Sequence, residues 1–286
     1  MTQSSTPPPV VVGVDRSANA ERAAAWAARE AADRGLPLHL VHALDLPKAA
    51  GQAVEPPNYA VIQRQAGEEL LERLATEIRR PHPDLAIRTE VSDLTAPETL
   101  VNLSRDAAFV VTGTRGHGGF AGMLLGSVSQ KLAAHAHGPA VVVRGEEPAQ
   151  PEQEIVLGVE PEQAEGPVRF AFESAAALGA RVRAVRVWHG YAGPGSDTDP
   201  VARERSETEE VDALLADVRR HHPEVLVSTA AVRGNPVPVL IEAARGARLL
   251  VVGSHRHHGP LSVGAGYVVQ GLLAHSPTPV AVVPVG

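Results

Sequence analysis

Short apolar runs alternate with longer amphipathic stretches along the chain. In the first half, five runs rich in β-branched residues predict buried strands at 10–14, 37–44, 85–91, 108–112 and 140–144. The stretches between them predict helices at 18–34, 59–80, 96–107 and 127–137. Ser17 and a capping box from Thr95 to Glu98 mark two of the helix starts. Nearly all-apolar strands that alternate with helices predict a parallel sheet covered on both faces.

The second half repeats this order. Its predicted strands lie at 155–159, 182–188, 225–232, 248–252 and 279–285, and its predicted helices include 167–178, 201–221 and 237–245. The motif at 10–15 recurs at 155–160, and the segments at 79–83, 110–113 and 139–143 each recur 140 residues later. Four matches in one order indicate a tandem duplication.

A proline- and acid-rich stretch at 146–154 lacks apolar periodicity and reads as the linker between the copies. We therefore expect two α/β domains, at 1–146 and 155–286. Each should be a Rossmann-like, doubly wound domain with a five-stranded parallel sheet.

A glycine-rich loop follows the fourth predicted strand. Gly113, Gly116 and Gly126 are separated by two and nine residues, and Ser127 opens the next predicted helix. Glycine lets a backbone approach a ligand closely, and a helix N-terminus offers unpaired N–H groups beside a partial positive charge. The stretch is therefore suited to bind phosphate, although an exposed glycine loop with Ser127 as a plain N-cap would show the same pattern.

Asp15 directly follows the first predicted strand. Ligands of open parallel sheets bind outside the carboxyl ends of the strands, where the strand order reverses. Strands one and four are neighbours in such a sheet, so Asp15 and the Gly113 loop should face one crevice. Other glycine motifs fit less well: neither Lys48 nor Lys131 follows the last glycine as a P-loop requires, and the dinucleotide fingerprint would follow the first strand.

The composition excludes or disfavours several kinds of chemistry and several kinds of partner. Cysteine is absent, which excludes disulfides, thiolate chemistry and cysteine-bound zinc. A formal net charge of −7 without a basic stripe, together with 3% aromatic residues, disfavours nucleic acid as a partner. The apolar runs are too short for a membrane span, and the polar, proline-rich start does not read as a signal peptide. We expect a soluble, cytoplasmic protein.

The glycine spacing, the strand that ends in Asp15 and the closing apolar strand at 139–143 together resemble the ATP-binding universal stress proteins, over nearly the whole chain. The resemblance implies ATP as the ligand, with or without Mg²⁺. It also implies that Asp15 contacts the adenosine part and that the Ala43 backbone contacts adenine, with Gly13 and Val14 in the same site. The residues that match the ribose and phosphate positions are Thr112, Gly113, Arg115, Gly116, Gly126, Ser127, Val128 and Ser129.

Asp15 and Arg115 also have interpretations that need no nucleotide. Asp15 could instead cap the first helix. Arg115 could pair with a phosphate or remain solvated. Ser127 and Ser129 would offer hydroxyl donors beside the helix N-terminus.

The second copy departs from the family pattern. Glu160 stands where the first copy has Asp15, Arg256 replaces the second glycine, and Tyr267 replaces the serine after Gly266. The added bulk predicts a degenerate site and about one ATP per chain, unless Arg256 reaches a phosphate and rescues binding. His255, His257 and His258 in the altered loop lack the spacing of a typical metal site, so we expect no metal.

No catalytic constellation stands out. Three functions stay open: a nucleotide-dependent stress sensor or regulator, a slow ATPase on the same scaffold, and an interaction module that needs no nucleotide. The family associates through its fifth strand, so the apolar edges at 140–144 and 280–285 should pair antiparallel. The result would be a pseudo-dimer within one chain or a homodimer.

Overall fold

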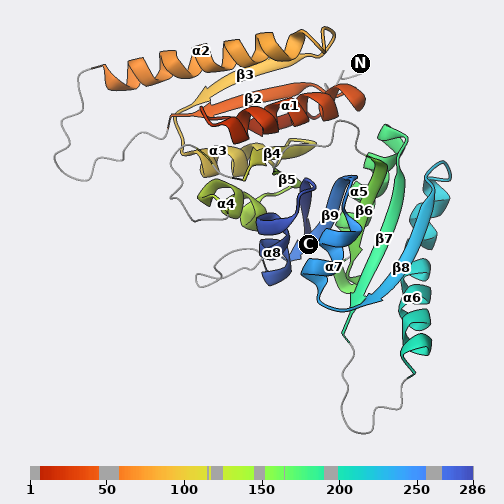
Figure 1. Cartoon of the computed structure of the whole chain (residues 1–286). Coiled ribbons are helices and arrows are strands. Elements are labelled where there is room, and N and C mark those ends of the chain that lie inside the picture. Colours follow the sequence, from red (N-terminus) through yellow and green to blue (C-terminus); the bar gives the residue numbers. More distant parts are fainter. Residues whose placement is uncertain are drawn as a thin grey trace. The chain divides into compact units, whose positions relative to one another are not determined.

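The computed structural model describes residues 7–44, 58–114, 116, 125–144, 152–163, 165–189, 199–255 and 266–285. The chain divides into two compact units, Met1–Val143 and Arg144–Gly286. Each unit is an α/β domain in which helices cover a parallel sheet (Figure 1). This confirms the predicted fold class of two Rossmann-like halves with five strands each.

The first unit has the strand order β3-β2-β1-β4-β5, and its paired neighbours are parallel. Its strands are β1 (Val10–Gly13), β2 (Leu38–Ala43), β3 (Ile87–Ser92), β4 (Phe109–Gly113) and β5 (Ala140–Val143). Its helices are α1 (Ala18–Asp33), α2 (Tyr59–Arg79), α3 (Ala96–Leu103) and α4 (Ser127–His135).

The second unit repeats this topology with the order β10-β9-β6-β7-β8. Its strands are β6 (Glu152–Val159), β7 (Arg181–Trp188), β8 (Val227–Arg233), β9 (Ala247–His255) and β10 (Val280–Val285). Its helices are α5 (Glu165–Leu178), α6 (Pro200–His221), α7 (Pro236–Ala243) and α8 (Tyr267–His275), with a short 3₁₀ turn, η1 (Pro161–Gln163).

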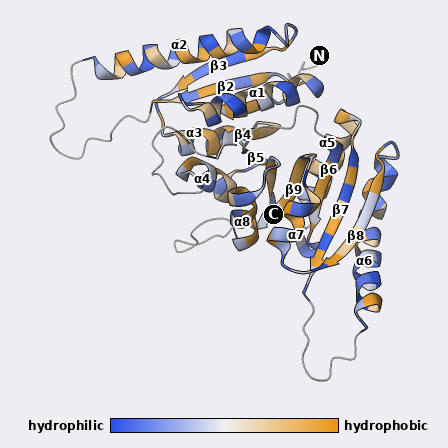
Figure 2. Cartoon of the chain, viewed as in Figure 1, coloured by the Kyte–Doolittle hydropathy of each residue, from blue (hydrophilic) through white to orange (hydrophobic). Residues whose placement is uncertain are grey.

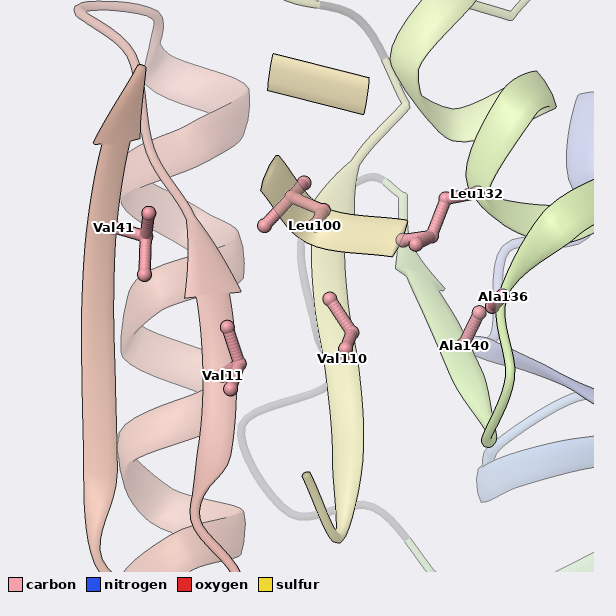
Figure 3. Packing of buried hydrophobic residues seen from close by; sticks show 7 residues of the cluster. All are labelled: Val11, Val41, Leu100, Val110, Leu132, Ala136 and Ala140. Carbon is pink, nitrogen blue, oxygen red and sulfur yellow. The ribbon is translucent and has the colours of Figure 1, made fainter. Parts of the chain in front are cut away.

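Burial on both faces explains the apolar composition of β1, β4 and β5, whereas the edge strand β3 is partly exposed and carries Arg88, Thr89 and Glu90. On one face of the first sheet, α3 and α4 pack a cluster against four strands (Figure 3): Val11, Val41, Leu100, Val110, Leu132, Ala136 and Ala140. Helix α1 packs against β1, β2, β4 and β5, and helix α2 packs against β2 and β3. Hydrophobic and hydrophilic colours alternate along α2, as expected for a helix with one buried face (Figure 2).

The predicted helix starts are confirmed at α1 and α3. The Ser17 side chain accepts a hydrogen bond from the Ala20 N–H at 3.2 Å, and Thr95 and Glu98 form the capping box. One helix end differs: α3 stops at Leu103 rather than at 107. The Ser104 hydroxyl donates to the Val101 carbonyl at 2.6 Å and accepts from the His137 N–H at 2.8 Å, which ends the helix at that point.

Other boundaries shift by a few residues, as at α5, which begins at Glu165 instead of 167. The predicted loops at 45–58 and 189–199 fall largely outside the described residues, as does the predicted linker up to residue 151. The linker prediction is wrong at its end, because β6 already begins at Glu152. Within the ranges that the structure describes, no helix has both the length and the apolar content to cross a bilayer.

Candidate functional site

A cavity of about 610 Å³ opens at the carboxyl ends of β1, β2 and β4. The strand order reverses there, because β1 pairs with β2 on one side and with β4 on the other. Asp15 and the Gly113 loop lie at this one crevice, as the sheet rule predicts.

The cavity lining includes eleven of the twelve candidate site residues: Gly13, Val14, Asp15, Ala43, Thr112, Gly113, Gly116, Gly126, Ser127, Val128 and Ser129. The twelfth, Arg115, lies outside the described residues. Sequence reasoning missed five polar residues of the lining: Arg16, His42, Gln63, Thr99 and Gln130. His42 could have been predicted, because it is a polar residue at the carboxyl end of the second predicted strand. Gln63 and Thr99 come from helices whose packing the sequence does not show.

Asp15 shapes the end of β1. Its Oδ1 accepts a hydrogen bond from the Ser17 N–H at 2.9 Å, while Ser17, not Asp15, is the N-cap of α1. The alternative reading of Asp15 as the helix cap is therefore wrong. A Cβ atom added at Gly116 would overlap Oδ2 of Asp15, so the loop after β4 reaches the carboxylate at the end of β1.

Two hydrogen bonds hold the ends of the loop between β4 and α4. The Gly126 N–H donates to the Thr114 carbonyl at 2.7 Å, and the Ser129 hydroxyl donates to the Gly113 carbonyl at 2.7 Å. Gly113 also sits tightly against α1, because a Cβ there would lie 2.8 Å from the Asn19 carbonyl oxygen. Glycine at 113 is therefore required for the packing of α1 against the end of β4.

The N-terminus of α4 faces the cavity with Gly126 as its N-cap and Ser127 as its first residue, so Ser127 is not a plain N-cap. The first-turn N–H groups of a helix have no partner within the helix and carry a partial positive charge. Ser129 is 1% exposed, and its hydroxyl proton goes to the β4 backbone. Ser129 therefore lines the cavity with its backbone, whereas its hydroxyl proton is used inside the protein.

His42 lies on the β2 side of the cavity. Its Nδ1 is 2.9 Å from the Val14 carbonyl oxygen, which can only accept, so Nδ1 carries the proton. The ring packs on Gly67 of α2, where an added Cβ would lie 2.7 Å from Cδ2 of His42. Glycine at 67 therefore leaves the room that the imidazole occupies.

The equivalent end of β6 in the second unit carries an ion-pair network. Arg186 Nη1 lies 2.6 Å from Glu160 Oε1, and Arg186 Nε lies 3.1 Å from Glu207 Oε2. Arg203 Nη2 completes the network at 2.6 Å from Glu207 Oε1. Burial lowers the pKa of Arg186, but the bonds to Glu160 and Glu207 outweigh it, so the pKa is raised overall and the guanidinium stays charged.

The remaining second-copy residues are only partly described. Tyr267 opens α8 and is 74% exposed. Arg256, His257 and His258 lie outside the described residues, as does the side chain of His255. Among the residues that are described, no group of histidines and acids is arranged to hold a metal ion.

Comparison with known proteins places the chain in a family. The model of the universal stress protein family matches residues 8–144 and again 152–284. A universal stress protein of Mycolicibacterium smegmatis is 33% identical over 297 residues, 99% of both chains. Universal stress protein Rv2623 of Mycobacterium tuberculosis is 32% identical, over 96% of this chain and 95% of its own.

The fold agrees as well. The crystal structure of a universal stress protein from Archaeoglobus fulgidus superposes with a TM-score of 0.73 at 17% identity, covering 97% of this chain and 96% of that one. The family model matches twice in tandem, the relatives match along nearly their whole length, and the fold is shared. The chain therefore belongs to the universal stress protein family and contains two of its domains.

Proposed function

We propose that the first unit binds ATP in the cavity at the carboxyl ends of β1, β2 and β4, and that occupancy of this site makes the chain a nucleotide-dependent stress sensor or regulator. One observation carries the proposal: Asp15, the Gly116 backbone and the N-terminus of α4 line the same cavity. They would supply an acceptor for hydroxyl groups, close backbone approach and a seat for phosphate.

The dimensions and polarity of the cavity suit a nucleotide. About 610 Å³ falls within the roughly 300–1,000 Å³ typical of small-molecule sites. In the proposed pose the phosphates lie at the first turn of α4, beside Gly126 and Ser127. The adenosine part lies toward Asp15 and Ala43, between apolar walls that include Val41 and Leu125.

The second unit is proposed to bind no ATP. Glu160, its counterpart of Asp15, is paired with Arg186 at 2.6 Å. Tyr267 adds an exposed aromatic side chain at the start of α8, where the first unit has Ser127. The proposed stoichiometry is therefore one ATP per chain.

Association through the fifth strands remains part of the proposal. β5 and β10 each stand last in the strand order of their own unit, and both are apolar. Apolar edge strands are normally paired or covered. We propose that β5 and β10 pair antiparallel, within one chain or between two.

Mass spectrometry of the nucleotide released from the purified chain, followed by calorimetric titration with ATP, tests the function. We expect ATP to be released and to rebind, and Asp15→Ala to weaken binding at least tenfold. Asp84→Ala, which removes an exposed acid in the turn before β3, is the matched control and should leave binding unchanged. A wild-type chain that neither carries nor binds ATP would refute the proposal.

A further inference from the structure

We propose that one pair of positions decides which unit of this chain accepts nucleotide. The pair joins the residue at the carboxyl end of the second strand of a unit to the residue facing it on the following helix. His42 with Gly67 leaves the crevice of the first unit available to a ligand, whereas Arg186 with Glu207 fills that of the second with an internal ion pair. The inference rests on the proposed ATP site of the first unit.

The strand register makes His42 and Arg186 equivalent. Gly13 is paired with Val41 in the first unit, and Gly158 with Val185 in the second. His42 and Arg186 are the next residues on the two strands. Gly67 and Glu207 are separated by the 140 residues that relate the repeated segments. The structure supports the same match, because Gly67 packs on His42 and Glu207 bonds to Arg186.

In the first unit the pair directs the imidazole to the backbone. His42 donates through Nδ1 to the Val14 carbonyl at 2.9 Å, on the residue just before Asp15. This bond needs the ring to lie where a side chain at 67 would be, since a Cβ there would come within 2.7 Å of Cδ2. The histidine therefore lines the cavity while its proton bonds to a carbonyl rather than to the acid.

In the second unit the arginine reaches the acid itself. The side chain of Arg186 is 17% exposed and bridges Glu160 to Glu207, whose side chain is 5% exposed. The acid that would face a ribose is thus already engaged by a fixed cation. A nucleotide would have to compete with a charge-assisted hydrogen bond to use it.

The two positions depend on each other. A half-buried arginine needs an acid beside it, and without Arg186 the buried Glu207 would keep only the exposed Arg203 as its cation. An imidazole at the same place needs glycine on the helix. The pair lies on the adenosine side of the crevice, so it acts separately from Tyr267 at the start of α8.

The test transplants the second pair into the first unit. His42→Arg/Gly67→Glu should weaken ATP binding of the whole chain at least tenfold in calorimetric titration. Because the new arginine would engage Asp15, adding Asp15→Ala to this variant should weaken binding no further. His82→Arg/Gln65→Glu carries the same changes in charge outside the cavity lining and should bind ATP as the wild type does.

His42→Arg alone is a second test variant in case the double variant does not fold, because it leaves the packing face of α2 unchanged. Thermal unfolding of each variant shows whether it is folded. A folded His42→Arg and a folded double variant that both bind ATP within threefold of the wild type would overturn the inference and leave the proposed function standing. A wild-type chain that binds no ATP would refute the proposed function itself.

Discussion

Gly116→Ala should weaken ATP binding by displacing Asp15. The new Cβ would overlap Oδ2 of the Asp15 carboxylate, so the carboxylate must move or the loop must open. Gly116 is exposed and lies outside helices and strands, so the substitution should leave the fold intact. The loss of a hydrogen bond involving a charged group costs about 1.5–3 kcal/mol. The dissociation constant should therefore rise by about 10- to 150-fold.

Calorimetric titration of a double-mutant cycle is the sharpest assay. If alanine at 116 acts through Asp15, Gly116→Ala/Asp15→Ala should bind no more weakly than Asp15→Ala alone. Gly266→Ala is the matched control, because a Cβ at that glycine of the second unit has no atom within 4 Å. Unchanged affinity in Gly116→Ala, or fully additive losses in the double variant, would refute the reasoning.

Three further predictions concern stability. Ser129→Ala removes a buried hydrogen bond and should lower the free energy of unfolding in urea by about 1 kcal/mol. Arg186→Met leaves Glu207 with only the exposed Arg203 as a partner, so the loss should be a fraction of the roughly 3–5 kcal/mol typical of broken buried pairs; an unchanged urea midpoint would argue against the network. Burial lowers the pKa of His39 below its ordinary value of 6.5, so the unfolded chain binds a proton first. Stability should fall as the pH drops below about 6.5, by up to about 1.4 kcal/mol per pH unit, and His39→Gln should flatten this dependence.

The sequence predicted the features that arise from local pattern or from general sheet geometry. Apolar runs and caps located the strands and the starts of α1 and α3. The rule for parallel sheets predicted that Asp15 and the Gly113 loop face one crevice, and Asp15, Gly113 and Gly116 do line one cavity in the structure.

Contacts between side chains distant in sequence could not be read from the same pattern. The pairing of Arg186 with Glu207 depends on how α6 packs against β7, and nothing in either segment alone marks it. The use of the Ser129 hydroxyl by the β4 backbone likewise appears only once the helix is in place. Tyr267 and Glu160 were visible as departures from the first copy, whereas the cation that engages Glu160 was not.

Equilibrium dialysis of ATP against the whole wild-type chain tests the central claim most directly. It counts bound nucleotide without assuming which unit holds it. We predict saturation at one ATP per chain, since the first unit has its acid, glycines and helix N-terminus at one cavity while the acid of the second is paired with Arg186. Saturation at two equivalents, or no binding at all, would contradict this prediction.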